Sequence, residues 1–100
     1  MASTGLTKGA FPRADIDEYV PQGETAGVYV IGWINEQGVF CVGYVGRSDH
    51  NDGGLNARLH DHDAKWPSWT HFKFDYFDAK AAFERESRIW HDFQLSKRGQ

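Results

Sequence analysis

Two apolar segments joined by a short polar link constrain the fold of this 100-residue chain more than any other feature. Residues 27–34 and 39–46 are apolar at nearly every position, and Asn35-Glu36-Gln37-Gly38 joins them. Asparagine at the first position and glycine at the last are typical of a type I turn. We therefore predict an antiparallel hairpin in which Asn35 lies opposite Gly38.

This turn also sets which residues of the hairpin pair. Antiparallel pairing that starts at the turn brings Ile34 opposite Val39 and Tyr29 opposite Tyr44. Directly opposed residues share one face of a sheet, so two phenol hydroxyls are expected side by side. Apolar runs without alternation are typical of a sheet that is covered on both faces, and helices are the expected cover.

The rest of the chain supplies helices and one more strand. Residues 55–66 place apolar side chains at helical spacing, and a proline follows them. Residues 71–78 alternate between apolar and polar side chains, as a strand with one apolar side does. Asp78 is placed to cap a helix over residues 79–94. The sequence thus predicts an α+β domain in which a hairpin and a third strand are covered by helices.

Composition limits the class of protein. A net charge of -3 shows no global basic field, and 40% hydrophobic content suits one small domain with one core. We expect residues 1–25 to form a partly flexible N-terminal arm, residues 26–94 the domain, and residues 95–100 a tail. The lone Cys41 permits no disulfide framework, and the chain lacks a membrane-spanning apolar run. We expect a soluble, intracellular (cytoplasmic) protein without a membrane partner.

One carboxylate breaks the apolar pattern of the last predicted helix. Glu86 lies four residues after Ala82 and four before Trp90, on the face expected to point toward the sheet. Burying a charge without a partner is costly. Glu86 therefore either lies at the margin of that face and pairs with Arg58 or Arg85, or it faces a cleft and binds a hard cation through oxygen.

A second helix brings further polar side chains toward the same sheet. One pocket could hold Arg58 and His62 together with Tyr29, Tyr44 and Glu86. Such a set offers a guanidinium for a phosphate, a carboxylate for a metal, and phenols or an imidazole for proton transfer. Each residue also has a purely structural interpretation, as a core tyrosine, a hydrogen-bonded core histidine or a solvated arginine. Only the arrangement of all five residues in one pocket would favour a catalytic function over these structural roles.

In these residues the chain resembles the GIY-YIG nuclease domain. The resemblance covers about residues 26–93 and rests on four motifs in order. They are Gly27-Val28-Tyr29, Tyr44-Val45-Gly46, Leu55-Asn56-Ala57-Arg58-Leu59-His60-Asp61-His62 and Ala82-Phe83-Glu84-Arg85-Glu86-Ser87-Arg88-Ile89-Trp90. The resemblance implies a three-stranded antiparallel sheet flanked by helices. It also implies hydrolysis of phosphodiester bonds in DNA with one divalent cation, Mg²⁺ or Mn²⁺.

The resemblance further implies a role for each residue of the site. Tyr29 would act as general base or orient the attacking water, assisted by His62 or Tyr44. Tyr44 would hold that water or a phosphate oxygen. Arg58 would stabilise the charge that builds on the phosphoryl oxygens. Glu86 would bind the metal ion, which activates the leaving oxygen as a Lewis acid.

Two more basic residues belong to the predicted substrate-binding set with Arg58. Arg47 directly follows the second tyrosine motif and is a candidate for phosphate contact, and Lys65 lies near the end of the same helix as Arg58. Arg47 has an alternative interpretation, as a loop residue that pairs with Asp49 or Asp52.

Three functions remain open at this point. The first is a stand-alone DNA endonuclease whose target is chosen by DNA structure, by self-association or by a targeting protein. The second is a module of the same fold that cleaves weakly or not at all and binds nucleic acid or protein through Trp33, Trp66 and Trp69. The third is a transition-metal site in residues 60–63 with His50. A helix separates residues two apart by about 200°, which disfavours a shared ion.

Overall fold

The computed structural model describes residues 4–23, 25–48, 53–66 and 68–93. The elements in chain order are β1 (Lys8–Pro12), the 3₁₀ helix η1 (Arg13–Asp15), α1 (Ile16–Tyr19), β2 (Gly27–Ile34), β3 (Phe40–Ser48), α2 (Gly54–Lys65), β4 (His71–Tyr76) and α3 (Ala79–Phe93). Within these ranges, no helix has both the length and the apolar composition that crossing a bilayer requires.

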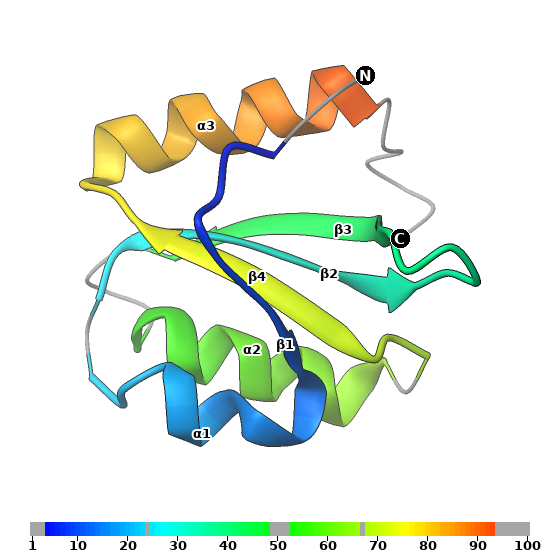
Figure 1. The fold of residues 1–100 in the computed structure, drawn as a ribbon. Coiled ribbons are helices and arrows are strands. Elements are labelled where there is room, and N and C mark those ends of the chain that lie inside the picture. The colour runs from blue at the N-terminus through cyan, green and yellow to red at the C-terminus, as the bar shows by residue number, and fades with distance from the viewer. Residues whose placement is uncertain (1–3, 24, 49–52, 67, 94–100) are drawn as a thin grey trace.

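The strands form one antiparallel sheet between two layers of helices. The strand order is β1-β4-β2-β3, with α3 on one face and with α1 and α2 on the other (Figure 1). The α+β class and the helix-flanked antiparallel sheet are confirmed. The predicted strand count is wrong, because the sheet has four strands instead of three. The extra strand β1 comes from the segment expected to be an arm, and it pairs Phe11 with Phe72 of β4.

The β2–β3 turn forms as predicted, but the register after it does not. The N–H of Gly38 donates to the carbonyl of Asn35 at 2.9 Å, as in a type I turn. Gly38 has a φ of 78°, and the next hydrogen bond joins Asn35 N–H to the carbonyl of Val39 at 2.9 Å. Asn35 therefore pairs with Val39 instead of Gly38, because the left-handed glycine adds one residue to the turn.

A second extra residue enters the hairpin farther along β3. Pairing is irregular between Ile31 and Gly32, so Tyr29 lies opposite Gly46 and Tyr44 lies opposite Ile31. The predicted pairing of Tyr29 with Tyr44 is therefore wrong by two residues. One single-residue shift would have placed the tyrosines on opposite faces, whereas two shifts keep them on the same face. Their ring centroids lie 6.4 Å apart.

The sheet separates two apolar cores. The buried residues on the side of α1 and α2 are Ile16, Val20, Tyr29, Ile31, Leu55, Leu59, Trp69, Phe72 and Phe74. Those on the side of α3 are Leu6, Val28, Val30, Val45, Ala82 and Ile89. The continuous apolar pattern of β2 follows from this, because alternate residues enter different cores. Asp78 caps α3 as predicted, since its Oδ1 accepts the N–H of Ala81 at 2.8 Å.

Candidate active site

Tyr29 is the side chain around which the candidate site is built. The central strand β2 directs it toward α2, and it is fully buried. Its hydroxyl oxygen lies 2.7 Å from Nε2 of His62 on α2. The two ring centroids are 5.5 Å apart. A phenol and an imidazole from distant parts of the chain therefore form one hydrogen-bonded pair.

The lack of a side chain at Gly46 leaves the space that the Tyr29 ring occupies. A Cβ atom at Gly46 would overlap the Oη and Cζ atoms of Tyr29. The ring therefore lies across bare backbone of β3, which is the edge strand of the sheet. This position brings the hydroxyl toward the edge of the sheet.

The electrostatic surroundings set the protonation states of the pair. Burial raises the pKa of Tyr29 well above its ordinary value, while the charge of Arg58 and a hydrogen bond from it oppose that rise. Burial lowers the pKa of His62, and the positive charge of Arg58 lowers it further. At neutral pH Tyr29 is therefore a neutral phenol and His62 a neutral imidazole. The hydroxyl can donate to Nε2 when the His62 proton is on Nδ1.

Tyr44 and His62 border an open hollow beside this pair. Their ring centroids lie 4.8 Å apart, and Trp66 packs edge-on against Tyr44 at 5.4 Å. The hollow has a volume of about 250 Å³, and its lining also includes Lys65. Lys65 forms an exposed ion pair with Asp61 at 3.1 Å. A molecule that enters the hollow thus meets an imidazole, a phenol and an ammonium group.

Glu86 comes from the other layer of the protein. It lies on α3, and its Oε1 accepts a hydrogen bond from Nε of Arg47 at 3.1 Å. The Arg47 guanidinium also lies 5.2 Å from the centroid of the Phe83 ring. This ion pair joins the candidate metal ligand to a candidate phosphate contact. Asp49 and Asp52, the other partners expected for Arg47, lie outside the described residues.

Glu86 approaches Tyr29 from a different layer than the other predicted site residues. Tyr29, Tyr44, Arg58 and His62 lie on the face that α2 covers, whereas α3 covers the opposite face (Figure 1). The negative charge of Glu86 nevertheless contributes to the raised pKa of Tyr29. The carboxylate therefore acts on the phenol although the two belong to different layers.

One acidic residue of α2 and one of β4 have partners in the N-terminal segment. Asp63 pairs with Arg13, and Asp75 accepts hydrogen bonds from Thr7 and Lys8. These contacts offset part of the negative charge that would oppose a polyanionic ligand. The net charge of -3 already counts these two basic residues, so the effect of the pairs is local to α2 and β4.

The two histidines of α2 serve different partners. His60 lies 2.7 Å from Asp17, whereas His62 lies against Tyr29. His50, the third member of the predicted transition-metal site, lies outside the described residues. Across the part of the chain that the structure describes, no three His, Cys, Asp or Glu side chains form a metal-binding group. His60 and His62 therefore do not share a partner in this geometry.

Comparison with protein-family models, curated proteins and solved structures finds no match to this chain. Reasoning from sequence missed the contact of Gly46 with Tyr29 and the pairing of Arg47 with Glu86. Both depend on β3 lying at the sheet edge, and the sequence signal for the first was the glycine that ends the second tyrosine motif.

Proposed function

We propose that this protein is a DNA endonuclease of the GIY-YIG type that hydrolyses phosphodiester bonds with a divalent metal ion. The observation that carries the proposal is the 2.7 Å contact between the Tyr29 hydroxyl and Nε2 of His62, with Arg58 acting on both. A buried phenol by itself is a poor base, but a phenol hydrogen-bonded to a neutral imidazole can pass on its proton. The pair can therefore take a proton from water and activate it as a nucleophile.

The proposed reaction is an attack of water on phosphorus. The water oxygen forms the new P–O bond while its proton passes to Oη of Tyr29. The phenol at the same time gives its own proton to Nε2 of His62, so that no phenolate accumulates. The bond from phosphorus to the leaving oxygen breaks, and the guanidinium of Arg58 stabilises the charge on the phosphoryl oxygens. Tyr44, at the hollow beside His62, is placed to orient the water or a phosphate oxygen.

The donor chemistry of Glu86 fits a hard cation. Its side chain is 25% exposed, and a carboxylate has oxygen lone pairs beyond those that one arginine N–H uses. Magnesium is commonly held by one or two carboxylates with water and substrate oxygens as its other ligands. When bound, Mg²⁺ or Mn²⁺ would supply Lewis-acid stabilisation of the leaving oxygen. Arg47, which donates a hydrogen bond to the Glu86 carboxylate and is 37% exposed, is the residue that we propose for a phosphate contact.

The proposal includes the expected partners and location. DNA is the substrate, and targeting comes from DNA structure, from self-association or from another protein. An intracellular location agrees with the free thiol of Cys41, because reducing compartments preserve thiols.

The test is cleavage of plasmid, linear and branched DNA by the purified protein with Mg²⁺ or Mn²⁺. Glu86→Gln should abolish metal-dependent cleavage. Arg58→Ala should reduce the rate by about 10²–10³-fold, as loss of one transition-state donor does. Tyr29→Phe should reduce the rate by about 10²–10⁴-fold, because it removes the proton relay.

Matched variants on α3 distinguish the loss of a catalytic group from a change in the charge of the helix. Glu84→Gln removes an exposed carboxylate two residues before Glu86, and Arg88→Ala removes an exposed arginine. Both should leave cleavage unchanged. Cleavage that persists in Glu86→Gln and Arg58→Ala would identify a contaminating nuclease and overturn the proposal. DNA binding without cleavage under any divalent ion would instead support the inactive binding module.

A further inference from the structure

His62 lies in the last turn of α2, where the helix ceases to satisfy its own backbone. Its carbonyl accepts the final helical hydrogen bond, from the N–H of Trp66 at 2.9 Å. The carbonyl of Asp63 would need an N–H four residues later, and that residue is Pro67, which has none. Helix ends fray where such groups lack partners. The position of the His62 side chain therefore depends on contacts from outside the helix.

Trp69 supplies one of these contacts. Its indole N–H donates to the carbonyl of His62 at 3.3 Å, in addition to the bond from Trp66. Trp69 is only 4% exposed and belongs to the core between the sheet and α2. Because a packed indole has little freedom to move, it fixes the carbonyl that it binds.

Arg13 supplies further contacts from the N-terminal segment. Its Nη2 donates to the carbonyl of Asp63 at 2.8 Å, and its Nη1 donates to the carbonyl of Trp69 at 3.0 Å. Its Nε pairs with the Asp63 carboxylate, and the guanidinium lies 4.9 Å from the centroid of the Trp69 ring. One planar guanidinium thus joins the residue next to His62 to the residue that binds the His62 carbonyl.

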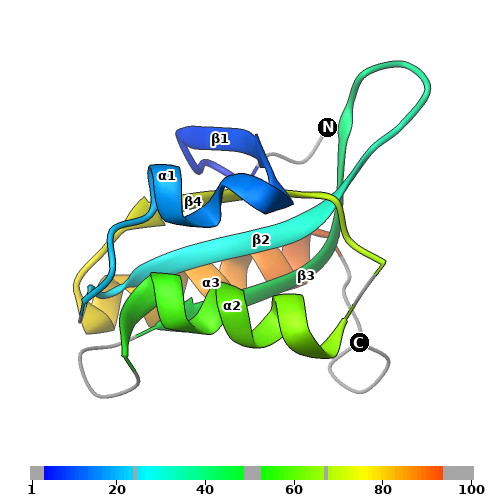
Figure 2. The ribbon, with the colours of Figure 1, turned by 90° about the horizontal axis from the view of Figure 1, so that it is seen from below.

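The fold brings the N-terminal segment to this end of α2. Arg13 begins η1, and α1, which follows η1, packs beside α2 on the same face of the sheet (Figure 2). The backbone N–H of Arg13 also donates to the carbonyl of Thr70 at 2.8 Å. Arg13 is therefore fixed through its backbone as well as through its side chain.

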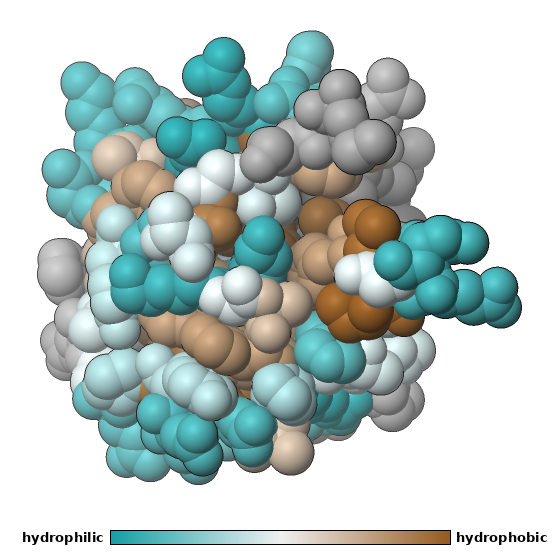
Figure 3. Space-filling view, in the orientation of Figure 1, coloured by the Kyte–Doolittle hydropathy of each residue, from teal (hydrophilic) through white to brown (hydrophobic). Residues whose placement is uncertain are grey.

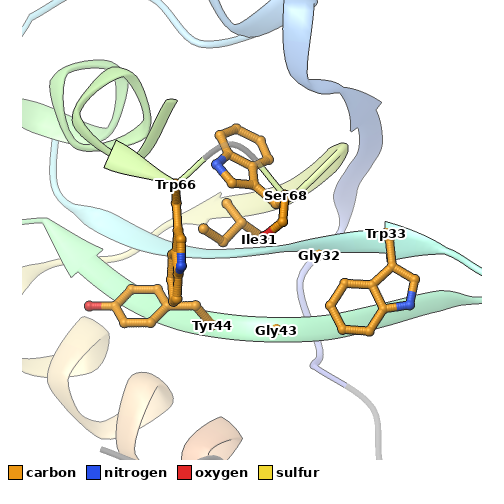
Figure 4. A pocket seen from close by; sticks show the side chains of 8 residues that line it. Ile31, Gly32, Trp33, Gly43, Tyr44, Trp66 and Ser68 are labelled. Atoms are coloured by element: carbon orange, nitrogen blue, oxygen red, sulfur yellow. The ribbon is translucent and has the colours of Figure 1, made fainter. Parts of the chain in front are cut away.

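The β2–β3 hairpin leaves space beside the end of α2. Figure 3 shows apolar side chains at the surface next to the hydrophilic turn of this hairpin, and Trp33 is 46% exposed. A recess of about 180 Å³ lies between Trp33 and Trp66, and Tyr44 also lines it (Figure 4). Unfilled space of this kind offers few packing contacts. It permits the end of α2 to move toward the hairpin, and the contacts of Trp69 and Arg13 oppose that movement.

We propose that Arg13 and Trp69 are positioning residues for His62. They fix the backbone of residues 62 and 63, and through it the imidazole whose Nε2 lies 2.7 Å from the Tyr29 hydroxyl. This inference rests on the proposed function, in which His62 accepts the proton of Tyr29. Because proton transfer requires hydrogen-bond distance, a shift of about 1 Å at the end of α2 would slow the reaction by about 10²-fold. The N-terminal segment then supports the active site although the resemblance covers only about residues 26–93.

The effect of Arg13 on His62 is geometric and not electrostatic. Its charge is paired with Asp63, and the charges that act on the imidazole are those of Arg58, Asp61 and Lys65. A variant that keeps the charge of Arg13 but loses its planar group therefore separates the two explanations. Lysine meets this requirement, because its single ammonium group lacks the rigid fork of a guanidinium.

The test follows the His62 imidazole by NMR titration without DNA and measures cleavage separately. In the wild type, burial and the charge of Arg58 hold the pKa of His62 below its ordinary 6.5. Trp69→Phe removes the indole N–H, and Arg13→Gln and Arg13→Lys remove the fork. Each should raise the pKa of His62 toward 6.5, because the ring moves toward water. In cleavage, each should lower kcat by about 10–10²-fold and leave the KM for DNA unchanged.

Lys8→Gln is the matched control, because it removes another ion pair of the N-terminal segment, in which Lys8 lies 3.5 Å from Asp75 on β4. It should change neither the pKa of His62 nor kcat. A wild-type pKa of His62 in both Trp69→Phe and Arg13→Gln would overturn the proposal even if the Tm falls, because the contacts would then stabilise α2 without positioning His62. A wild-type pKa in Arg13→Lys alone would overturn the geometric role of Arg13.

The positioning of His62 and the nuclease activity fail in different ways. Variants that shift the pKa of His62 in a protein that cleaves no DNA under any divalent ion would support the positioning and refute the nuclease. Cleavage by the wild type with an unaltered pKa in the variants would do the reverse. If Trp69→Phe does not fold, the Arg13 variants decide, since the Arg13 side chain is 23% exposed.

Discussion

Gly46→Ala is the substitution that most directly tests how the candidate site is assembled. The added methyl group would overlap Oη and Cζ of Tyr29, which is fully buried. Backbone and side chain must then separate, and the Tyr29 hydroxyl must move from its 2.7 Å contact with His62. We therefore expect one methyl group on β3 to lower both stability and activity.

The magnitude follows from two opposing terms. Forcing an extra methyl group into a packed site costs about 1–3 kcal/mol. Alanine also restricts the unfolded chain relative to glycine, which returns about 0.4–1 kcal/mol. The net loss is about 1–2 kcal/mol, and each kcal/mol lowers the Tm of a domain of this size by about 4–8 °C. A displacement of the hydroxyl by about 1 Å should slow cleavage by about 10²-fold.

The assay is thermal unfolding of four proteins: wild type, Gly46→Ala, Tyr29→Phe and the double variant. Gly46→Ala should cost less in the Tyr29→Phe background, because phenylalanine lacks the hydroxyl oxygen, the nearest of the three overlapping atoms. Gly43→Ala is the matched control on the same strand, since its Cβ would meet only the exposed indole of Trp33 and the Ile31 carbonyl, at 3.0 Å or more. Equal costs of Gly46→Ala in both backgrounds would show that the Tyr29 hydroxyl does not occupy this space.

Three further predictions concern buried polar groups. Because the folded pKa of His62 lies below its ordinary 6.5, unfolding takes up a proton as the pH falls below about 6.5. Urea unfolding across this range should show wild type losing more stability toward acid pH than His62→Gln. Absorbance titration should show one tyrosine that ionises well above the ordinary range, and Tyr29→Phe should remove it. Asn56→Ala should cost about 1–3 kcal/mol in urea unfolding, because the carbonyl of Val20 loses a 2.8 Å hydrogen bond in a buried site; an unchanged midpoint would contradict this.

The hairpin shows how far local sequence rules predict this fold. Turn chemistry predicted Asn35 and Gly38 in their observed places, because asparagine and left-handed glycine act through nearby backbone groups. The predicted register was wrong because Gly38 and Gly43 are extra residues, and each of them changes the pairing by one residue. Whether Gly43 pairs or bulges depends on Trp33 packing against it and on the strands beside it. The contact with Trp33 lies within the hairpin, but no local turn or pairing rule specifies it.

The sequence did not predict the N-terminal strand β1 for a related reason. Residues Lys8–Pro12 are short and contain glycine and proline, and they lack the alternation of a strand. They pair only because β4 offers an open edge, and Phe11 joins the core through Phe72 at 5.7 Å between centroids. The sequence of β4 was sufficient to predict a strand but carried no indication of which segment covers its edge.

The candidate site follows from the position of β3 at the edge of the sheet. Inside a sheet, backbone and side chains separate the faces, and packed layers lie about 10 Å apart. A phenol on one face and a carboxylate on the other then have little influence on each other. At an edge strand with glycine at position 46, the Tyr29 ring crosses bare backbone, and among the described residues no further strand lies beyond it. Glu86 can therefore act on Tyr29 from α3, and a site assembled from both layers requires β3 to remain unpaired on its outer side.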